Sequence, residues 1–371
     1  MRLKELKLYN FRNVADGTLQ FGDGITLISG SNGQGKTNIL EAISFLSHAK
    51  SFRTPKSREV IRWGGNECSI FGTIAHDISP THTQLGVSIS SRKKEGYRDG
   101  VRMESLADFI GVFTTVGFTP TDLLLVKGSP GERRAFLDKH IIYFEAKLFQ
   151  HLLTYQRALR NKNALLAAAR ENPSELPPEK VAPWNRILSE SAVQITAARK
   201  RFLGELESEA KAVYRQFAPS EEQLSLSLLS GIEQRCGVEL SAEQVFAALQ
   251  GELQRELRNG RSVIGPHRDD IQILIADREA RLYASQGQTR SIVLALKLAV
   301  IHLLERQRRE RPVLLLDDVD SELDRQRAGA LFDVIFRGER QVIITCTSAD
   351  RIPISPERYR LLQVRNGVVQ G

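Results

Sequence analysis

The sequence contains the stretch Gly30-Ser-Asn-Gly-Gln-Gly-Lys-Thr37, which has the form G-x-x-x-x-G-K-[ST] of a phosphate-binding loop. An apolar, β-prone segment, Ile25–Ser29, precedes the loop, and apolar residues at helical spacing follow it from Asn38 onward. A strand, a glycine loop and a helix start are the context that such a loop requires. Ordinary residue frequencies produce this pattern by accident in roughly 1% of chains of this length. We therefore favour a nucleotide site over a chance glycine turn.

The chemistry of the loop assigns a role to each residue type. Glycines let backbone N–H groups wrap around a phosphate, and the N-terminus of the following helix adds the positive end of its dipole. We expect Lys36 to reach the β- and γ-phosphates, with a role in catalysis, and the Thr37 hydroxyl to ligate Mg²⁺. The residues predicted to hold the nucleotide are Gly30, Ser31, Asn32, Gly33, Gln34, Gly35, Lys36 and Thr37.

A second motif completes the predicted site. The apolar run Val313–Leu316 leads into two adjacent acids, Asp317 and Asp318. We expect Asp317 to hold Mg²⁺, directly or through water, and Asp318 to orient or deprotonate the attacking water. The alternative is a buried strand that ends in ordinary capping acids. The phosphate-binding loop elsewhere in the chain favours the catalytic interpretation.

Composition places the chain in a broad class. It has 371 residues, of which 41% are hydrophobic and 26% charged, as in soluble globular proteins. The net charge of +8 suits a polyanionic partner, although many basic proteins bind no nucleic acid. The charged N-terminus has no signal-peptide core, and no apolar run approaches membrane-spanning length, so we expect no membrane association. Three distant cysteines argue against a disulfide framework or a zinc site and predict a reducing, cytoplasmic location.

Sequence patterns predict an α/β fold with a large insertion. Strands are expected at Leu3–Tyr9, Thr18–Phe21, Ile25–Ser29, Cys68–Ala75, Gln84–Ser90, Asp270–Ile275, Val313–Leu316 and Gln341–Thr345. Helices are expected at Ala146–Arg170, Trp184–Phe217, Ala242–Leu257 and Gln288–Gln307. The proline-rich break between the first two helices suggests a short antiparallel arm.

The two halves of the nucleotide site lie far apart in the chain, because Asp317 follows Lys36 by 281 residues. A compact P-loop domain closes that gap in far fewer residues, so the helical stretch is the expected insert. We predict an ABC-type P-loop ATPase head in residues 1–105 and 270–371, and a helical arm, or lobe II, in residues 106–269. This layout resembles that of the SMC (structural maintenance of chromosomes) group.

The segment Tyr283-Ala-Ser-Gln-Gly-Gln-Thr-Arg290 precedes the helix predicted to start at Gln288. Ser285, Gln286 and Gly287 are expected to cap that helix with outward-facing N–H groups, and a simple N-cap is the alternative. The segment stands where ABC-type ATPases carry their Ser-Gly-Gly-Gln signature, which binds the γ-phosphate of the nucleotide in the other subunit. By this resemblance the chain forms an ATP-dependent homodimer around two ATP molecules, and Ser321–Asp324 matches the D-loop of the same class.

Further strings, read in order, resemble the RecF family of bacterial replication and repair ATPases over essentially the whole chain. They are Leu8-Tyr-Asn-Phe-Arg-Asn13, Leu40-Glu-Ala-Ile43 after the loop, Phe118-Thr-Pro-Thr-Asp-Leu-Leu-Leu-Val-Lys-Gly-Ser-Pro130, Arg133-Arg-Ala-Phe-Leu-Asp138, Gly265-Pro-His-Arg-Asp-Asp270, Ala284-Ser-Gln-Gly-Gln288 and Leu315-Leu-Asp-Asp-Val-Asp-Ser-Glu-Leu-Asp324.

The resemblance implies an ABC-type head with a short helical arm, and ATP with Mg²⁺ as its cofactors. It implies a weak, DNA-dependent ATPase that uses ATP as a dimerisation switch. It implies sequence-independent binding to gapped DNA or to single-strand/double-strand junctions. It also implies partnership with the mediators RecR and RecO in loading RecA, and a part in DNA damage repair and the SOS response.

Three positions depart from the ABC pattern or leave alternatives open. No glutamine stands at the usual Q-loop, where Asp122 is a possible substitute. Thr345-Cys-Thr347 replaces the transporter H-loop histidine, which fits the DNA-repair branch better. Arg12 is either an α-phosphate contact, by analogy with related heads, or a solvated arginine at the end of a strand.

The segment His267–Asp270 invites a catalytic interpretation, but we favour a structural role or a contact at the junction of head and arm. Three basic clusters are candidates for DNA contacts. The first is Lys50, Arg53, Lys56, Arg58 and Arg62, the second is Arg92, Lys93, Lys94, Arg98 and Arg102, and the third is Arg306, Arg308, Arg309 and Arg311. Acids alternate with the third cluster, so we interpret it as solvated charge and favour the first two.

Three other functions are weighed against this interpretation. An ABC transporter subunit would carry the H-loop histidine, and an SMC-like tether would need hundreds of residues of heptad coil or a zinc hook. An adaptor that binds ATP without hydrolysing it has no distinguishing sequence feature. Because the chain has no helix-turn-helix, zinc finger or aromatic RNA platform, we do not expect base-specific readout.

Overall fold

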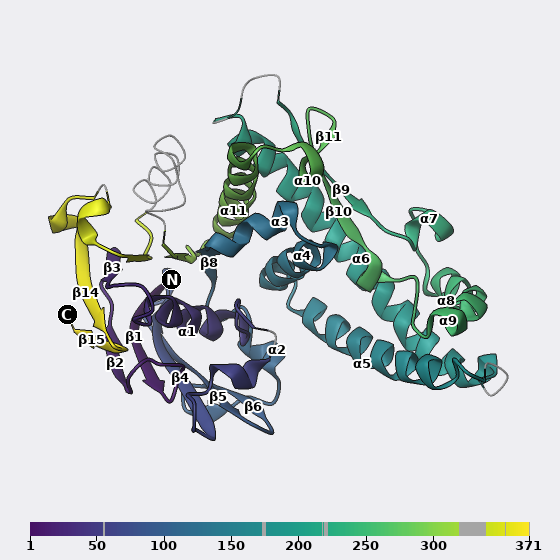
Figure 1. The fold of residues 1–371 in the computed structure, drawn as a ribbon, viewed down its shortest axis with the longest axis horizontal. Helices are drawn as coiled ribbons and strands as arrows, with labels where there is room; N and C mark the ends of the chain where they lie inside the picture. The colour runs from purple at the N-terminus through teal and green to yellow at the C-terminus, as the bar shows by residue number, and fades with distance from the viewer. Residues whose placement is uncertain are drawn as a thin grey trace. The chain divides into compact units, whose positions relative to one another are not determined.

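The computed structural model describes residues 1–54, 56–172, 176–216, 218, 222–318, 339–352 and 354–370. The chain divides into two compact units. Unit 1 comprises Met1–Leu123, Ala212–Pro219 and Gln286–Gly371, and unit 2 comprises Leu124–Lys211 and Ser220–Ser285. Figure 1 shows the course of the chain through both units.

A mainly parallel sheet forms the centre of unit 1, with strand order β15-β14-β3-β13-β12-β8. Its strands are β3 (Ile25–Ser29), β8 (Thr115–Phe118), β12 (Val313–Leu316), β13 (Val342–Cys346), β14 (Tyr359–Arg365) and the antiparallel edge strand β15 (Val368–Gln370). Every residue of β12 and β13 is buried, as expected for central parallel strands covered on both faces. The yellow C-terminal strand β14 lies beside the purple strand β3 in Figure 1, so both ends of the sequence contribute to one sheet.

A second sheet of unit 1 is antiparallel, with order β2-β1-β4-β5-β6-β7. Its strands are β1 (Arg2–Tyr9), β2 (Gly17–Gln20), β4 (Glu67–Ala75), β5 (His82–Ser90), β6 (Lys94–Arg98) and β7 (Val101–Arg102). The helix α1 (Lys36–His48) contacts strands of both sheets, and its residues from Ile39 to His48 are all buried. Two-sided contact explains why this helix is not amphipathic. Short elements of the unit are α2 (Leu106–Phe109), η1 (Ser57–Val60), η2 (Pro120–Leu123), η5 (Ala349–Arg351) and η6 (Pro356–Arg358).

The helix α11 (Gln286–Arg308) packs against β8 in unit 1. By length and composition it could cross a membrane, which the sequence patterns did not indicate. However, 78% of its most apolar window is buried inside the protein, as in the core helix of a globular domain.

Unit 2 is mostly helical and carries a three-stranded antiparallel sheet of order β11-β10-β9. Its elements are α3 (Leu124–Lys127), α4 (Pro130–Phe144), α5 (Lys147–Ala168), α6 (Pro178–Tyr214, which ends in unit 1), β9 (Leu224–Leu229), α7 (Glu233–Cys236), α8 (Ala242–Gly251), α9 (Leu253–Asn259), η4 (Pro266–Arg268), β10 (Asp270–Ile275), β11 (Arg278–Glu279) and α10 (Ala280–Tyr283). Leu166, Val181 and Leu257 belong to one buried cluster that joins α5, α6 and α9. The start of α4 follows from Ser129, which accepts a cap hydrogen bond, and from a proline at the first helical position.

Most expected elements are confirmed, and the corrections have physical reasons. Strands Ile25–Ser29, Asp270–Ile275 and Val313–Leu316 have the predicted bounds. The helix expected from Trp184 begins at Pro178, because proline fits the start of a helix. The helix expected at Ala242–Leu257 is two helices, α8 and α9, that meet after Gly251.

The unit boundaries differ from the expected segment ends at residues 105 and 269. The strand β8, which falls within the expected insertion, pairs in parallel with β12 and so belongs to unit 1. The strand β10, expected to begin the C-terminal head segment, pairs with β9 and so belongs to unit 2. Backbone pairing between distant segments decides both assignments, and local sequence patterns do not report it.

Candidate functional site

The phosphate-binding loop has the backbone that its glycines predict. Gly33 and Gly35 have φ angles of 81° and 109°, and Gly35 is the N-cap of α1. Residues with side chains rarely adopt such angles. At Gly30 the constraint is space, because a Cβ atom would lie 2.4 Å from the backbone oxygen of Val364 on β14. The loop therefore requires glycine at these positions.

Lys36 folds back over this loop. Its Nζ atom donates to the carbonyl oxygens of Gly30 at 2.7 Å and Ser31 at 3.2 Å. The side chain is buried, so the ammonium group is held against the loop that it is predicted to serve.

The two predicted halves of the site meet at Asp317. The Oδ1 atom of Asp317 accepts hydrogen bonds from the hydroxyls of Thr37 at 2.9 Å and Thr345 at 2.7 Å. Thr37 and Asp317 are 280 residues apart in the sequence. Burial raises the pKa of Asp317; the hydrogen bonds from Thr345 and Thr37 oppose this rise and neighbouring Asp318 adds to it. Arg53 opposes the rise as well, but the described residues that contact Asp317 directly are hydroxyls, so its carboxylate forms an oxygen-rich site without a directly bound cation among the described side chains.

This set of donors fits Mg²⁺, which prefers oxygen ligands and commonly takes few of them from the protein when substrate phosphates supply the rest. Thr37 and Asp317 are the residues that would hold the ion. Within the described part of the chain, no group of three or more histidine, cysteine, aspartate or glutamate side chains forms an all-protein metal site. Thr37 and Asp317 therefore fit a metal ion that binds together with a nucleotide.

Asp318 follows Asp317 in a left-handed backbone conformation, with a φ angle of 56°. Its N–H donates to the hydroxyl of Thr345 at 3.0 Å. Thr345 therefore holds both acids, although it was not among the sequence-predicted site residues. A signal was present, because Thr345 lies near the carboxyl end of β13, the strand next to β12, and the carboxyl ends of parallel strands share one edge.

Arg12 lies in a contact that neither sequence-based alternative named. Its Nε and Nη2 atoms donate to the two carboxylate oxygens of Glu41 at 3.0 and 2.7 Å, and its Nη1 atom donates to the carbonyl of Glu59 at 2.8 Å. Glu41 lies on α1 and is fully buried. Arg12 is therefore not a solvated arginine, and it links the segment after β1 to the helix that carries the loop.

The loop is also held from two sides by residues that the sequence analysis did not single out. The Asn13 side chain donates to the carbonyl of Gly33 at 3.3 Å. On the other side, the turn between β14 and β15 reaches Gln34, whose carbonyl accepts from the N–H of Gly367 at 3.0 Å. The Asn366-Gly367 dipeptide is typical of a two-residue hairpin and was the available signal.

Ser285, Gln286 and Gly287 were expected to precede a helix starting at Gln288, but α11 begins at Gln286. Gln286 and Gly287 are thus in its first turn, where N–H groups lack intrahelical acceptors. The described residues give no hydrogen bond between Gln286 or Gly287 and residues 30–37. Lys127 stabilises the segment that precedes Ser285. Its Nζ atom donates to the carbonyls of Ala280, Arg281 and Ala284. The proposed D-loop, Ser321–Asp324, lies outside the described residues.

Asp122, the possible Q-loop substitute, follows β8 beside the strand that carries Asp317. Its carboxylate accepts from the N–H of Thr119 at 2.6 Å and from the ammonium of Lys297, which also bonds the carbonyl of Gly117. Burial lowers the pKa of Lys297, and Asp122 opposes that effect. The loop after β8 is therefore tied to α11 through a buried ion pair.

The His267–Asp270 segment lies in a network of charges within unit 2. Arg199 binds both carboxylate oxygens of Asp138 at 2.9 Å and reaches Asp269 at 3.0 Å. Arg133 binds Asp270 through two hydrogen bonds of 2.6 and 2.9 Å. His267 contacts the Tyr155 hydroxyl at 2.7 Å, and burial lowers the pKa of this histidine to about 4. A largely buried histidine that is neutral at pH 7 supports a structural role rather than proton transfer.

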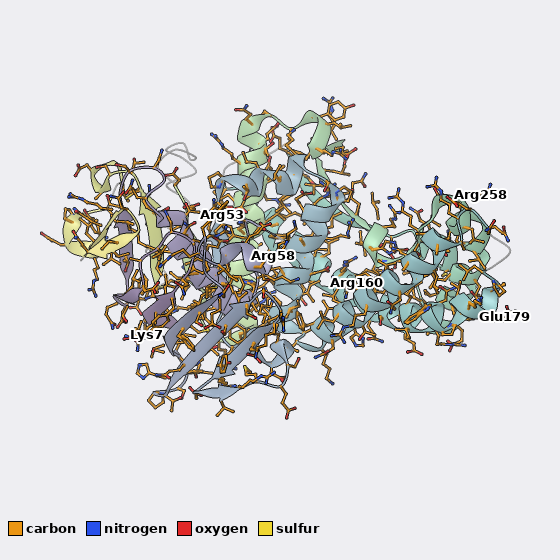
Figure 2. All side chains as sticks on the ribbon, turned by 60° about the horizontal axis from the view of Figure 1, so that its bottom comes forward. Lys7, Arg53, Arg58, Arg160, Glu179 and Arg258 are labelled. Atoms are coloured by element: carbon orange, nitrogen blue, oxygen red, sulfur yellow. The ribbon has the colours of Figure 1, made fainter. Side chains whose placement is uncertain are left out.

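The structure separates the basic clusters. In the second cluster, Lys93 and Arg102 both pair with Glu95, at 3.0 and 2.9 Å. Lys94 is held by the carbonyl of Ala49, and burial lowers its pKa to about 8. The first cluster has exposed cations at Arg53, Lys56 and Arg58, and Figure 2 labels Arg53 and Arg58. Arg53 and Lys56 lie 3.8 and 3.9 Å from carboxylate oxygens, farther than the cations that pair with Glu95 in the second cluster. These weaker pairs make the first cluster the better candidate for binding a polyanion.

Comparison with known proteins gives a consistent result. The family model described as the RecF/RecN/SMC N terminal domain matches residues 2–370. The DNA replication and repair protein RecF of Desulfitobacterium hafniense (strain DSM 10664 / DCB-2) is 36% identical over 370 residues, covering 100% of this chain and 99% of that protein. RecF of Lactococcus lactis subsp. cremoris (strain MG1363) is 34% identical over 372 residues, covering 100% and 99%.

Solved structures agree with the sequence matches. A structure of the recombination mediator protein RecF with ATP, from the RecFOR pathway, has a TM-score of 0.88 and 31% identity, covering 99% of this chain and 96% of that one. An SMC head bound to the C-terminal winged-helix domain of ScpA has a TM-score of 0.54 and 15% identity, covering 99% of this chain and 96% of the other. The second likeness shows that the fold is that of an ABC-type head.

Proposed function

The chain belongs to the RecF/RecN/SMC N-terminal domain family of ABC-type ATPases, and from this membership we propose that it is an ATP-dependent DNA-binding protein of replication and recombinational repair. The observation that carries the proposal is the hydrogen bond of 2.9 Å between Thr37 and Asp317. It unites a phosphate-binding loop and a buried acid strand that the sequence keeps far apart. A related RecF has been solved with ATP, which supports ATP as the nucleotide.

We assign the site residues as follows. Residues 30–37 wrap the triphosphate with backbone N–H groups, and Lys36 neutralises its β- and γ-phosphates. Thr37 and Asp317 hold Mg²⁺, and Asp318 orients or deprotonates the attacking water. Arg12 reaches an α-phosphate by leaving or sharing its contact with Glu41.

The active form is a homodimer that closes on two ATP molecules, with Ser285, Gln286 and Gly287 of each chain contacting the γ-phosphate held by the other. The first turn of α11 offers N–H groups for this contact. Unit 1 is the ATPase head and unit 2 is the helical arm. Hydrolysis is slow and DNA-dependent, so ATP acts as a dimerisation switch.

The dimer binds gapped DNA and single-strand/double-strand junctions without base specificity, through phosphate contacts. It works in the cytoplasm with the mediators RecR and RecO to load RecA, and it supports SOS induction. The basis of these assignments is membership of the family and the RecFOR pathway named for a structural relative. A non-hydrolysing adaptor is the second candidate, because a buried acid such as Asp317 serves nucleotide binding as well as turnover.

The test is particle mass by light scattering, with and without ATP–Mg²⁺ and a gapped duplex. Wild type is expected to double its mass with ATP and Mg²⁺. Lys36→Met is expected to stay single, because it lacks the cation that neutralises the phosphates, whereas Asp318→Asn is expected to accumulate as a dimer. Dimerisation of Lys36→Met at normal ATP would contradict the assignment, and Asp318→Asn turning over ATP at the wild-type rate would contradict the role of that acid.

A further inference from the structure

Among the described residues, Trp63 in unit 1 is the most exposed large hydrophobic side chain. Its side chain is 100% exposed, whereas tryptophan is on average one of the most buried residue types. It occupies the first central position of a tight turn, in which the N–H of Gly65 donates to the carbonyl of Arg62 at 2.9 Å. Gly64 at the next position has a φ angle of 82°, as a type II turn requires. The turn therefore places the Trp63 side chain in solvent.

The base of this turn is firmly attached to the head. The N–H of Arg62 donates to the carbonyl of Asn10 at 2.8 Å, and Phe11 forms an isolated antiparallel bridge with Ile61. The Arg62 guanidinium also binds Asp16 at 2.7 Å. Because the backbone of the turn is already anchored, only the two side-chain torsions of Trp63 have to be fixed when its ring binds a flat partner.

A second exposed aromatic side chain and several exposed cations lie in the two segments that adjoin this turn. Tyr9, which is 48% exposed, directly precedes Asn10. The segment that leads to the turn carries the exposed side chains of Arg53, Lys56 and Arg58. Its acid Glu59 is 3.9 Å from Lys56 and leaves an excess of positive charge. Aromatic rings beside cations are the arrangement by which proteins bind single-stranded nucleic acid.

We propose that Trp63 stacks on an unpaired base of the bound DNA, while Arg53, Lys56 and Arg58 contact the adjoining phosphates. The inference rests on the proposed DNA-binding function and names the feature of the DNA that this surface selects. A base inside a duplex has both faces covered by its neighbours, so a protein ring can stack on it only where the duplex is interrupted. Stacking discriminates little between bases, which agrees with binding that ignores sequence.

The surface is linked to the nucleotide loop by contacts within the same unit. The backbone N–H of Arg12 donates to the carbonyl of Val60, which lies two residues before Arg62 at the start of the turn. The guanidinium of Arg12 binds Glu41 on α1. Asn13 then contacts the carbonyl of Gly33 in the loop. DNA held at Trp63 thus lies on the segment that supports the phosphate-binding loop.

The chain contains two tryptophans, Trp63 and Trp184, so a fluorescence test of the inference is possible. Trp184→Phe leaves Trp63 as the sole tryptophan, so its fluorescence reports directly on stacking. A gapped duplex or a 5′-tailed duplex is expected to quench this emission, and a blunt duplex of the same length is not. In the full-length protein with ATP–Mg²⁺, Trp63→Ala is expected to weaken binding to the gapped duplex about 10-fold or more and to leave blunt-duplex binding unchanged.

Two variants separate stacking from charge. Trp63→Phe keeps a ring and is expected to restore most of the affinity for gapped DNA. Arg58→Ala is expected to weaken gapped and blunt DNA alike and to reduce the salt dependence of both. Because the Trp63 side chain is fully exposed, Trp63→Ala and Trp63→Phe are expected to keep the urea midpoint of the wild type.

Unquenched emission together with unchanged affinity of Trp63→Ala for gapped DNA would overturn the inference. If Trp63→Ala instead lost binding to a protein partner with DNA binding intact, the turn would be a protein-docking site and the inference would be wrong. Failure of the wild-type chain to bind any DNA would instead remove the proposed function on which the inference rests.

Discussion

Two buried acids, one in each unit, respond to burial in the same way but differ in what faces them. Asp317 in unit 1 is 7% exposed and Asp269 in unit 2 is 0% exposed. Burial raises the pKa of both, and the pKa of Asp269 rises to about 6 although Arg199 opposes the shift. Asp269 has the guanidinium of Arg199 at 3.0 Å. Among the described residues, the side chains that bind Asp317 are the hydroxyls of Thr37 and Thr345.

The difference separates a structural charge network from a binding site. In unit 2, three arginines face three aspartates, so the chain supplies its own counter-charges; these residues are Arg133, Arg134, Arg199, Asp138, Asp269 and Asp270. Among the described residues of unit 1, the groups that contact Asp317 are hydroxyls without charge, the adjacent Asp318 adds a second acid, and the positive charge of Arg53 makes the smallest contribution to the pKa of Asp317. The cost of burying Asp317 is offset from outside, in our account by the Mg²⁺ that accompanies ATP.

The largest expected effect is on the network of unit 2. Arg199→Met leaves Asp138 and Asp269 without their cation and is expected to lower the free energy of unfolding by about 3–5 kcal/mol. The measurement is urea denaturation at pH 7. The matched control is Arg201→Met on the same helix, because Arg201 pairs with Glu145 at the surface and is expected to cost about 1 kcal/mol or less. Equal losses for the two variants would remove the distinction between the network and a surface pair.

The next effect concerns the centre of unit 1. ATP with Mg²⁺ at a hundredfold excess over its dissociation constant is expected to stabilise the wild-type chain by about 2.7 kcal/mol. Asp317→Asn is expected to lose most of this stabilisation, because the variant lacks the charge that holds the ion. Thermal unfolding with ATP–Mg²⁺ and with ATP–EDTA measures it. Asp269→Asn should respond to ATP–Mg²⁺ as the wild type does; a loss of the response there would mean that the two acids are not functionally distinct.

A smaller effect is a pH dependence in unit 2. Because the folded pKa of Asp269 is raised from 3.8 to about 6, its ionised form is disfavoured in the folded state. The stability from this group is fully present below pH 3.8 and is lost as the pH rises through 6. Lowering the pH from 7 to 5 should therefore favour wild type over Asp269→Asn by about 1 kcal/mol. Parallel pH profiles of the two proteins in urea denaturation would show that Asp269 does not titrate in this range.

The smallest expected effect is a gain in stability, in the absence of nucleotide, when the charge of Asp317 is removed. Without nucleotide or metal, Asp317→Asn is expected to raise the free energy of unfolding at pH 7 by about 1 kcal/mol or less, because it removes a buried charge that binds only hydroxyls among the described side chains, while its amide oxygen still accepts from Thr37 and Thr345. Urea denaturation in EDTA is the measurement. A clear loss of stability would show that the ionised carboxylate is itself a structural element of the nucleotide-free head.

Local patterns predicted much of the site, and the remainder depends on pairing between distant segments. The loop at residues 30–37 and the acids after Val313–Leu316 were identified because each motif is continuous in sequence. Thr345 and the Asn366-Gly367 turn were missed, because they reach the site through strand neighbours, β13 beside β12 and β14 beside β3. Arg12 was predicted either to contact an α-phosphate or to be solvated, and its contact with Glu41 was missed, because Glu41 lies on another element and no spacing rule pairs the two residues.

The same reason explains the unit boundaries. The unit to which β8 or β10 belongs depends on the strand with which it pairs, β12 for β8 and β9 for β10. The exposed Trp63 was also missed, since nothing in the residue type distinguishes an exposed tryptophan from a buried one. Its turn, Arg62-Trp-Gly-Gly65, was readable from the glycines.

The central claim is that Asp317 helps to hold the metal ion that accompanies ATP. The most direct test is the binding of Mn²⁺ in place of Mg²⁺, measured by electron paramagnetic resonance in the presence of ATP. Wild type and Asp269→Asn are expected to remove Mn²⁺–ATP from solution with similar affinity, whereas Asp317→Asn leaves most of the ion free. Uptake by Asp317→Asn equal to that of the wild type would contradict the account, because the metal would then be held elsewhere.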